Sequence, residues 1–187
     1  AAFARLGEGG LDILVNNVGQ RDRRPLDQLQ RDDMAAMLAT NLVAPFDLAR
    51  RAVPLMQARK YGRIINITSV AVKQPIDGLI LSNAVRAAVT GFAKTLANEV
   101  AASGVTVNNV MPGFTRTKRL DGLAGNISET QGITVEEAFA RWEGQSPMGR
   151  IGEPTEFAAL VTFLASERAS YITGTSIPVD GGFIQAL

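Results

Sequence analysis

The stretch that decides the fold is Leu11–Gly19, which reads Leu-Asp-Ile-Leu-Val-Asn-Asn-Val-Gly. A short aliphatic run that follows glycines and ends in a polar, glycine-containing turn is typical of a buried strand. We therefore expect a buried strand over residues 11–16. Its end, Asn16–Gly19, is expected to form a turn.

The same pattern recurs along the chain, with long helical segments between the strands. Strands separated by helices of this length are βαβ units, which form a parallel sheet with helices on both faces. The sequence therefore predicts an α/β fold of the doubly wound, Rossmann type, in a single domain over residues 1–187. Further strands are expected at 63–67, 105–110 and 176–179, and helices at about 32–59 (capped by Asp32 or Asp33), 79–102 and 154–166. The segment 114–153 is expected to be irregular, with short helices of which 134–143 is the clearest.

Composition excludes several functional classes. The 187 residues include no cysteine and no histidine, which removes disulfides, thiol nucleophiles, thiolate metal sites and the usual general base. No metal site is predicted. The net charge is +1 with acids and bases interspersed, so neither a nucleic-acid nor a membrane partner is expected. Without a long apolar run or a signal peptide, the sequence predicts a soluble, cytoplasmic protein.

Polar or glycine-containing clusters follow each expected strand. In open α/β sheets, ligands bind beyond the carboxyl ends of the strands. Any one cluster is weak evidence because turns favour the same residue types. Their occurrence after all of the strands predicts a ligand site, formed by Asn16–Gly19, Thr68-Ser69, Asn109–Gly113 and Asp180–Gly182.

The order and spacing of these motifs resemble the short-chain dehydrogenase/reductase family across essentially the whole chain. The matching motifs are Asn-Asn-x-Gly at 16–19, Asn41 in Thr-Asn-Leu, Asn66–Ser69, Pro112-Gly113-x-x-x-Thr117, and Thr173-Gly174 leading to Val179–Gly182. The resemblance implies an oxidoreductase that transfers a hydride between NADP or NAD and a small-molecule carbonyl or alcohol. The branch that it favours is the 3-oxoacyl-carrier-protein reductase-like one. It also implies a homodimer or homotetramer assembled through the helices 32–59 and 79–102.

The resemblance further assigns site residues. Asn41 and Ser69 match the asparagine and the substrate-binding serine of the family's catalytic set. Residues 114–150 match its substrate lid. The residues that match its cofactor-binding positions are Asn17, Val18, Gly19, Arg86, Pro112, Gly113 and Thr117.

The catalytic Tyr-x-x-x-Lys of the family is altered in this chain. Alignment on Ala87-Ala88-Val89 places Ser82 at the tyrosine position and Arg86 at the lysine position. An alkyl hydroxyl is far less acidic than a phenol, whose pKa is about 10. Arg86 stays protonated and cannot be a general base, although it can bind a ribose hydroxyl. Proton delivery is then left to Ser82, a water or Lys73. The alternative is a catalytically impaired pseudo-enzyme, or a truncated fragment, that keeps the fold for oligomerisation or ligand binding.

The glycine-rich, phosphate-binding turn of the family is not found in these residues. Gly7–Gly10 precedes a strand rather than a helix, so it fails the structural context of that motif. The opening residues 1–6 lack methionine and read as the end of a helix. We therefore expect an N-terminally truncated domain that lacks the first three strands, with the edge of the strand at 11–16 exposed.

Two further features have more than one interpretation. Small residues recur on one face of the helix 79–102, which indicates either close packing on the sheet or contact with a partner subunit. They are Ala84, Ala87, Ala88, Gly91 and Thr95. Lys118, Arg119 and Arg141 are either ordinary solvated residues or positions that attract an anionic substrate or carrier.

Overall fold

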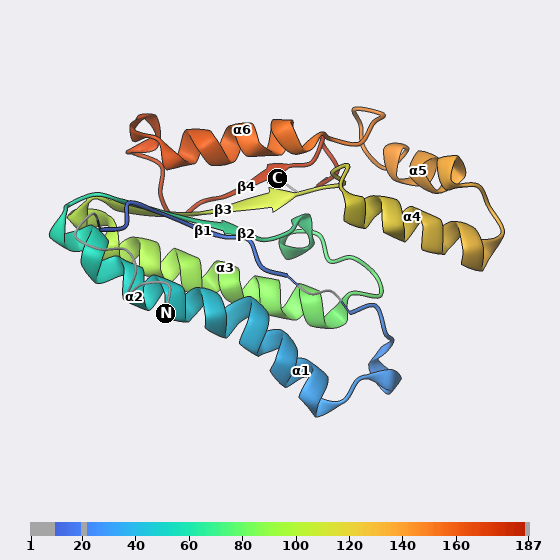
Figure 1. Cartoon of the computed structure of the whole chain (residues 1–187), viewed down its shortest axis with the longest axis horizontal. Coiled ribbons are helices and arrows are strands. Elements are labelled where there is room, and N and C mark those ends of the chain that lie inside the picture. The colour runs from blue at the N-terminus through green and yellow to red at the C-terminus, as the bar shows by residue number, and fades with distance from the viewer. Residues whose placement is uncertain (1–9, 20–21, 186–187) are drawn as a thin grey trace.

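In the part of the chain that the structure describes, four parallel strands form one sheet in the order β1-β2-β3-β4 (Figure 1). The computed structural model describes residues 10–19 and 22–185, so the helix end expected at 1–6 lies outside the described residues. The predicted α/β fold is confirmed, and each predicted strand is present. The strands are β1 (Ile13–Asn16), β2 (Gly62–Ile67), β3 (Val105–Pro112) and β4 (Ser176–Val179).

Helices cover both faces of this sheet, as predicted (Figure 1). One face carries α1 (Arg31–Leu38), α2 (Ala44–Ala58) and α3 (Ile80–Val100), and the other carries α6 (Pro154–Ala165). Beside the sheet, α4 (Lys118–Gln131) and α5 (Val135–Glu143) pack on each other. Short 3-10 turns lie at Leu26–Gln28, Val70–Val72, Ala101–Ser103 and Glu167–Ala169.

Two separate apolar layers hold the helices to the sheet. Buried alanines of α2 and α3, among them Ala49, Ala52 and Ala97, pack against Ile64 and Val107 of the strands. On the opposite face, Leu164 of α6 packs on Ile65 and Val110. Strand residues therefore alternate between the two layers, as the pleat requires.

The first long helix differs from its prediction at its start and in its middle. Its N-cap is Gln30 rather than Asp32 or Asp33. Asp33 takes the third helical position instead and accepts a hydrogen bond from the Gln30 backbone at 2.8 Å, which completes a capping box. A π-helical turn, Ala39–Val43, separates α1 from α2. Hydrophobic periodicity does not reveal such a one-residue insertion in the helical repeat.

The prediction that β1 is buried is wrong for half of its side chains. Ile13 and Val15 are each 43% exposed, whereas Asn16 is buried and Leu14 packs on the core between α2, α3 and the sheet. The reason is topological, because β1 is the edge strand and the opposite face has no helix over it among the described residues. This matches the exposed edge that was expected for the first strand of this chain.

The segment expected to be irregular contains the 14-residue helix α4. Gly122 and Gly125 disfavour a helix, but the Thr117 side chain caps it by accepting from the Leu120 amide. Its apolar residues meet Trp142 and Ala138 of α5 in a small core of their own. Tertiary packing therefore outweighs the local propensity.

The small-residue face of α3 does not pack on the sheet, and that interpretation is wrong. All five of its residues are exposed: Ala84, Ala87, Ala88, Gly91 and Thr95. The buried face of α3 is the neighbouring one, which carries Val85, Val89, Ala93 and Ala97.

In the described part of the chain, no helix is long and apolar enough to cross a membrane.

Candidate functional site

A row of buried amides links the four strands to one another. Asn16, Asn66, Asn109 and Ser176 are in register across β1 to β4. The Asn16 amide donates to Asn66 at 2.8 Å, Asn66 donates to Asn109 at 3.1 Å, and Asn109 donates to the Ser176 hydroxyl at 3.0 Å. These bonds cross the sheet at the end of β1, near the end of β2, within β3 and at the first residue of β4, so they fix the four strands relative to one another.

Beyond this row lies a cleft of about 300 Å³, and it brings the predicted cofactor-binding residues together. The turn after β1 forms one wall, and the segment after β3 with the start of α4 forms another. All seven predicted positions line it: Asn17, Val18, Gly19, Arg86, Pro112, Gly113 and Thr117. Their common location is observed, and their role in cofactor binding stays a prediction.

Gly113 is required by the packing at the end of β4. Its amide donates to the Val179 carbonyl at 3.0 Å. A Cβ at this position would lie 2.7 Å from the backbone and side chain of Asp180, closer than real Cβ contacts come. The segment Pro112–Thr117 is therefore held against β4, and the Thr117 hydroxyl at its end keeps its own hydrogen for a ligand acceptor.

Arg86 joins the ends of β1 and β2 inside the cleft. Its side chain is 93% buried, since only 7% of the residue is exposed. Its Nη1 donates to the Thr68 carbonyl at 2.7 Å and to the Ile67 carbonyl at 3.2 Å. A Cβ on Gly19 would collide with its Nη2, so Gly19 leaves the space that the guanidinium fills. Arg86 is thus bonded to main-chain atoms that shape the cleft.

The π-helical turn places Asn41 beside Arg86. Asn41 is buried, and its amide donates to the Met37 carbonyl at 3.1 Å. Its Oδ1 has no hydrogen-bond partner among the described residues, and it faces the space next to Gly19. Asn41 and Arg86 line one small cavity together with Thr68. Extra residues of this kind in a helix often mark functional positions.

The two predicted catalytic serines are buried but are not among the residues that line the cleft. The Ser69 hydroxyl accepts from the Ala71 amide at 3.1 Å and caps the 3-10 turn that follows β2. The Ser82 hydroxyl accepts from Arg86 Nε at 3.4 Å. Lys73, the alternative proton donor, is exposed and also lies outside the cleft lining. The catalytic roles of Asn41, Ser69, Ser82 and Arg86 stay predictions.

No tyrosine takes the place of the one replaced by Ser82. Tyr61 lies at the start of β2 and contacts the Ala165 carbonyl at 3.5 Å. Tyr171 is fully exposed on the far side of β4. Neither lines the cleft.

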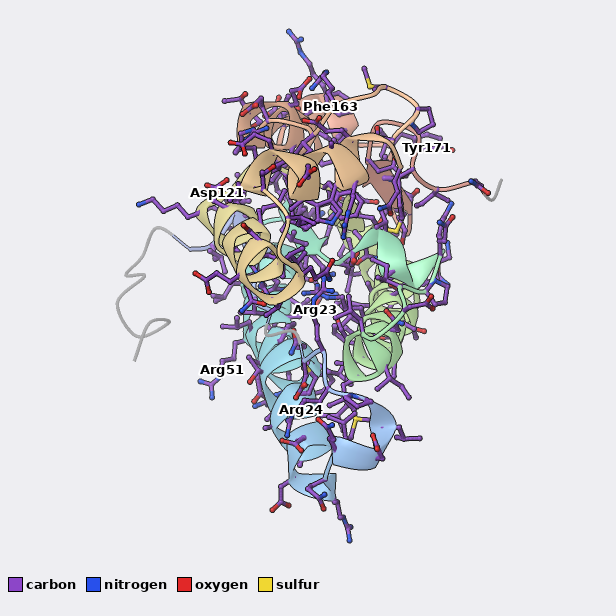
Figure 2. The ribbon with its side chains drawn as sticks, turned by 90° about the vertical axis from the view of Figure 1, so that its right-hand side faces the viewer. Arg23, Arg24, Arg51, Asp121, Phe163 and Tyr171 are labelled. Atoms are coloured by element: carbon purple, nitrogen blue, oxygen red, sulfur yellow. The ribbon has the colours of Figure 1, made fainter. Side chains whose placement is uncertain are left out.

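Among the charged residues of the cleft, sequence reasoning missed one and undervalued another. Arg23 lines the cleft, and Figure 2 shows it towards the centre of the view while Arg51 and Asp121 lie at its edge. Arg119 reaches across from α4, where its Nη1 donates to the Gly19 carbonyl at 3.3 Å. The signal for Arg119 was its position two residues after Thr117. No sequence pattern marked Arg23, because its position depends on the path of the irregular loop between β1 and α1.

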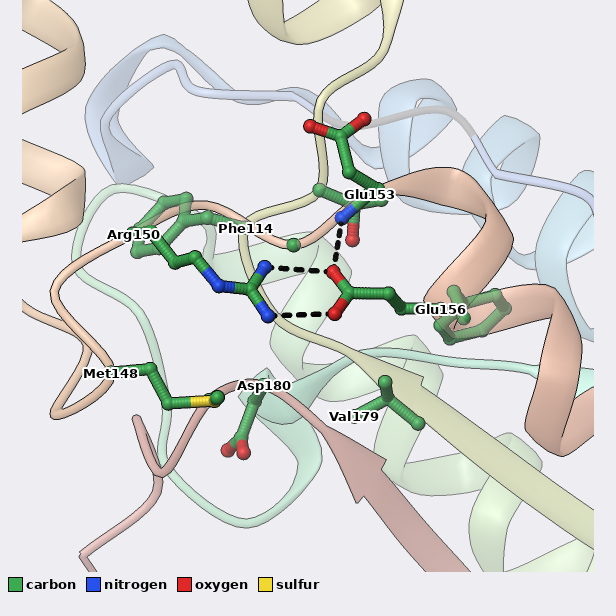
Figure 3. A pocket seen from close by; sticks show the side chains of 11 residues that line it. Phe114, Met148, Arg150, Glu153, Glu156, Val179 and Asp180 are labelled. Carbon is green, nitrogen blue, oxygen red and sulfur yellow. Dashed lines mark hydrogen bonds and ion pairs between the residues drawn. The ribbon is translucent and has the colours of Figure 1, made fainter.

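A second, smaller pocket lies between the start of α6 and the end of β4 (Figure 3). Arg150 binds both carboxylate oxygens of Glu156, at 2.8 and 2.6 Å, and lowers the pKa of Glu156 to about 2. Asp180 accepts from the Gly182 and Ile184 amides at 3.0 and 2.9 Å. These charged groups satisfy one another or the backbone, which is typical of a structural contact.

A parallel sheet with helices on both faces and a cleft at its strand ends belongs to the doubly wound, Rossmann-type class of α/β proteins. Over residues 1–184 the sequence matches the family described as Enoyl-(Acyl carrier protein) reductase. The chain belongs to the short-chain dehydrogenase/reductase family. The predicted function, hydride transfer between NAD(P)(H) and a carbonyl or alcohol, is that of this family of oxidoreductases.

Individual relatives are similar over nearly the whole chain. The 3-oxoacyl-(acyl-carrier-protein) reductase FabG of Vibrio cholerae is 39% identical over 93% of this chain and 67% of its own length. The NADPH-dependent reductase BacG of Bacillus subtilis is 35% identical over 96% of this chain and 69% of its own. Among solved structures, L-sorbose reductase of Gluconobacter frateurii with NADPH and L-sorbose has a TM-score of 0.94 at 32% identity, covering 100% of this chain and 71% of its own.

Proposed function

We propose that this chain provides the nicotinamide end of an NAD(P)-dependent reductase that acts on a small 3-oxoacyl-like carbonyl compound. The observation that carries this proposal is the convergence of the seven predicted cofactor-binding positions on one cleft. The named relatives, which include an acetoacetyl-CoA reductase of Shinella zoogloeoides at 35% identity, support the substrate class. Whether NADP or NAD is preferred is left to experiment.

The residues of the cleft fit a nicotinamide ribose and its carboxamide. When bound, the nicotinamide supplies or accepts the hydride. Gly19 allows the Arg86 guanidinium to approach the turn after β1, Arg86 in turn binds the carbonyls at the end of β2, and Thr117 offers a hydroxyl. Residues 114–150, which include α4 and α5 with their separate small core, are proposed to cover the substrate as a lid.

Proton transfer is the weak step of the proposed reaction. Ser82 replaces a phenol with an alkyl hydroxyl, and the neighbour that donates to it, Arg86 Nε at 3.4 Å, is a permanent cation that cannot accept its proton. A well-matched proton donor contributes about 10²–10⁴ in rate. We therefore expect turnover that is slower than that of a tyrosine-containing relative by a factor in this range.

Deuteride transfer tests the function more sensitively than absorbance. The protein is incubated with NADPH deuterated at C4 and with acetoacetyl thioester, and the 3-hydroxy product is analysed by mass spectrometry. Deuterium in the product supports the function if Ser69→Ala reduces it and if Ser170→Ala, at an exposed position, leaves it unchanged. Unlabelled or absent product with both NADPH and NADH contradicts it.

A ligand-binding pseudo-enzyme is the second candidate. It is favoured because Arg86 is bonded to main-chain carbonyls and neither serine lines the cleft. The double change Ser82→Tyr with Arg86→Lys separates the two. If the unaltered protein is inert and the double variant gains turnover, the pseudo-enzyme is supported, whereas measurable turnover by the unaltered protein rejects it.

We further propose a homodimer or homotetramer that is formed through α2 and α3. The exposed small residues of α3 allow close approach of a second helix. Beside them lies an apolar groove lined by Phe46, Val53, Phe92 and Leu96, among others. Large apolar residues left on a surface of this kind are typical of interfaces.

A further inference from the structure

The cleft is strongly positive. Three arginines line it, Arg23, Arg86 and Arg119, and no aspartate or glutamate is among the described residues of its lining. The nearest acid in sequence to Arg23 is Asp22, but the Asp22 carboxylate is bound by Arg24, and this contact lowers its pKa to about 2. The charge of the cleft is therefore not neutralised from that side.

Arg23 and Arg119 stand on different segments. Arg23 belongs to the loop before α1, whereas Arg119 is in the first turn of α4 and binds the Gly19 carbonyl through Nη1. A guanidinium has five N–H donors, so this single bond leaves most of the Arg119 donors available. Neither arginine forms an ion pair within the part of the chain that the structure describes.

We propose that the cleft binds an oxyanion, a phosphate or a carboxylate, between Arg23 and Arg119. This inference rests on the proposed function, because it states that the ligand of the reductase cleft carries a negative charge where it lies between Arg23 and Arg119. Arginine suits the role because its planar fork matches two oxygens of a phosphate or carboxylate. The oxyanion has two possible sources, the pyrophosphate of the cofactor or an acidic group on the carbonyl substrate.

The shared chemistry is tested with inorganic pyrophosphate by isothermal titration calorimetry. We expect saturable binding that weakens as salt rises, and a dissociation constant about tenfold higher in Arg23→Gln or Arg119→Gln, since a hydrogen bond to a charged group is worth about that factor. Lys118→Gln is the matched control, because it removes the same charge from the neighbouring position of the same helix and Lys118 is not in the cleft lining. Arg119→Lys should restore part of the affinity.

Unchanged binding in the Arg23→Gln, Arg119→Gln double variant overturns the inference, and so does an equal loss in Lys118→Gln. If Arg119→Gln unfolds the protein, Arg23→Gln still tests the site, because of these two arginines only Arg119 is bonded to Gly19.

Kinetics identify the source of the oxyanion. If Arg119→Gln raises KM for NADPH equally with acetoacetate and with the uncharged acetylacetone, the oxyanion belongs to the cofactor. If it lowers kcat/KM for acetoacetate alone, the oxyanion belongs to the substrate. The two proposals can also fail separately. If the unaltered protein shows no turnover but binds pyrophosphate, and the double variant loses that binding, the oxyanion site is supported and the proposed function is rejected.

Discussion

Gly19 and Arg86 form the closest fit in the site. A methyl group at Gly19 would meet Arg86 Nη2, and the guanidinium is held by two backbone carbonyls and cannot move away without losing them. We expect Gly19→Ala to destabilise the fold by about 1–3 kcal/mol, as overpacking does. Urea unfolding measures this change.

The matched control for Gly19→Ala is Gly122→Ala. No atom lies within 4 Å of a Cβ at Gly122, which is inside α4. This change should stabilise by up to about 1 kcal/mol, because alanine is the better helix former. Equal effects of the two substitutions would show that Arg86 does not occupy the space beside Gly19.

Asn66 is the central member of the amide row. Asn66→Ala would leave the Asn16 amide and the Asn109 carbonyl oxygen buried without their partner. Each such group costs about 1–3 kcal/mol. Ser176→Ala, at the end of the row, removes one partner only and should cost less. If the two variants have the same urea midpoint, the row does not hold the strands together.

At the level of residues, the sequence predicted the location of those site residues that directly follow a strand. Asn17, Gly19, Gly113 and Thr117 were placed correctly in one region because parallel strands end at one edge of the sheet. Arg23 could not be placed in this way. The direction of Asn41 depends on a π-helical turn, which no pattern in the sequence marks.

Among the helices, α6 depends on a charged contact at its start. Glu156 occupies the third position of α6, accepts from the Glu153 amide at 2.8 Å and binds Arg150. Its pKa is lowered from 4.5 to about 2, chiefly by the hydrogen bonds from Arg150. The unfolded chain therefore takes up this proton more readily than the folded one as pH falls.

The contribution of the Glu156 carboxylate to the free energy of unfolding is fully present above pH 4.5, and it is lost as pH falls towards about 2. We expect Glu156→Gln to be less stable at neutral pH and to show a shallower decline of stability across this window. Glu129→Gln, an exposed residue of α4, should keep the slope of the unaltered protein. Thermal melts recorded at a series of pH values give both slopes, and an unchanged slope in Glu156→Gln would reject the role of the Arg150 contact.

Element prediction succeeded where periodicity and packing agree. The limits of strands β2 and β3 and of helix α3 match their predictions within about two residues, although α3 buries a different face from the small-residue one. Prediction failed for α4, because its glycines disfavour a helix and the packing against α5 that stabilises it cannot be read from the sequence. It also failed for the exposed side of β1, because burial depends on neighbours outside the strand itself.

For the whole molecule, the proposed assembly through α2 and α3 is open to a direct test. Ala88 is exposed on α3, and Ala88→Arg would place a charged side chain against the partner helix. We expect this variant to be monomeric by light scattering after size exclusion, while Thr130→Arg on α4 keeps the oligomer. An unaltered protein that is monomeric at all concentrations would contradict the assembly.

The location of the nicotinamide end is tested most directly by titrating the isotope-labelled protein with NADPH and following its amide resonances. We expect the largest shifts at Gly19, Thr68 and Gly113, which line the cleft at the ends of β1, β2 and β3. Largest shifts at Gly152 and Gly181, in the pocket of Figure 3, or no shifts at saturating NADPH would contradict the cofactor site.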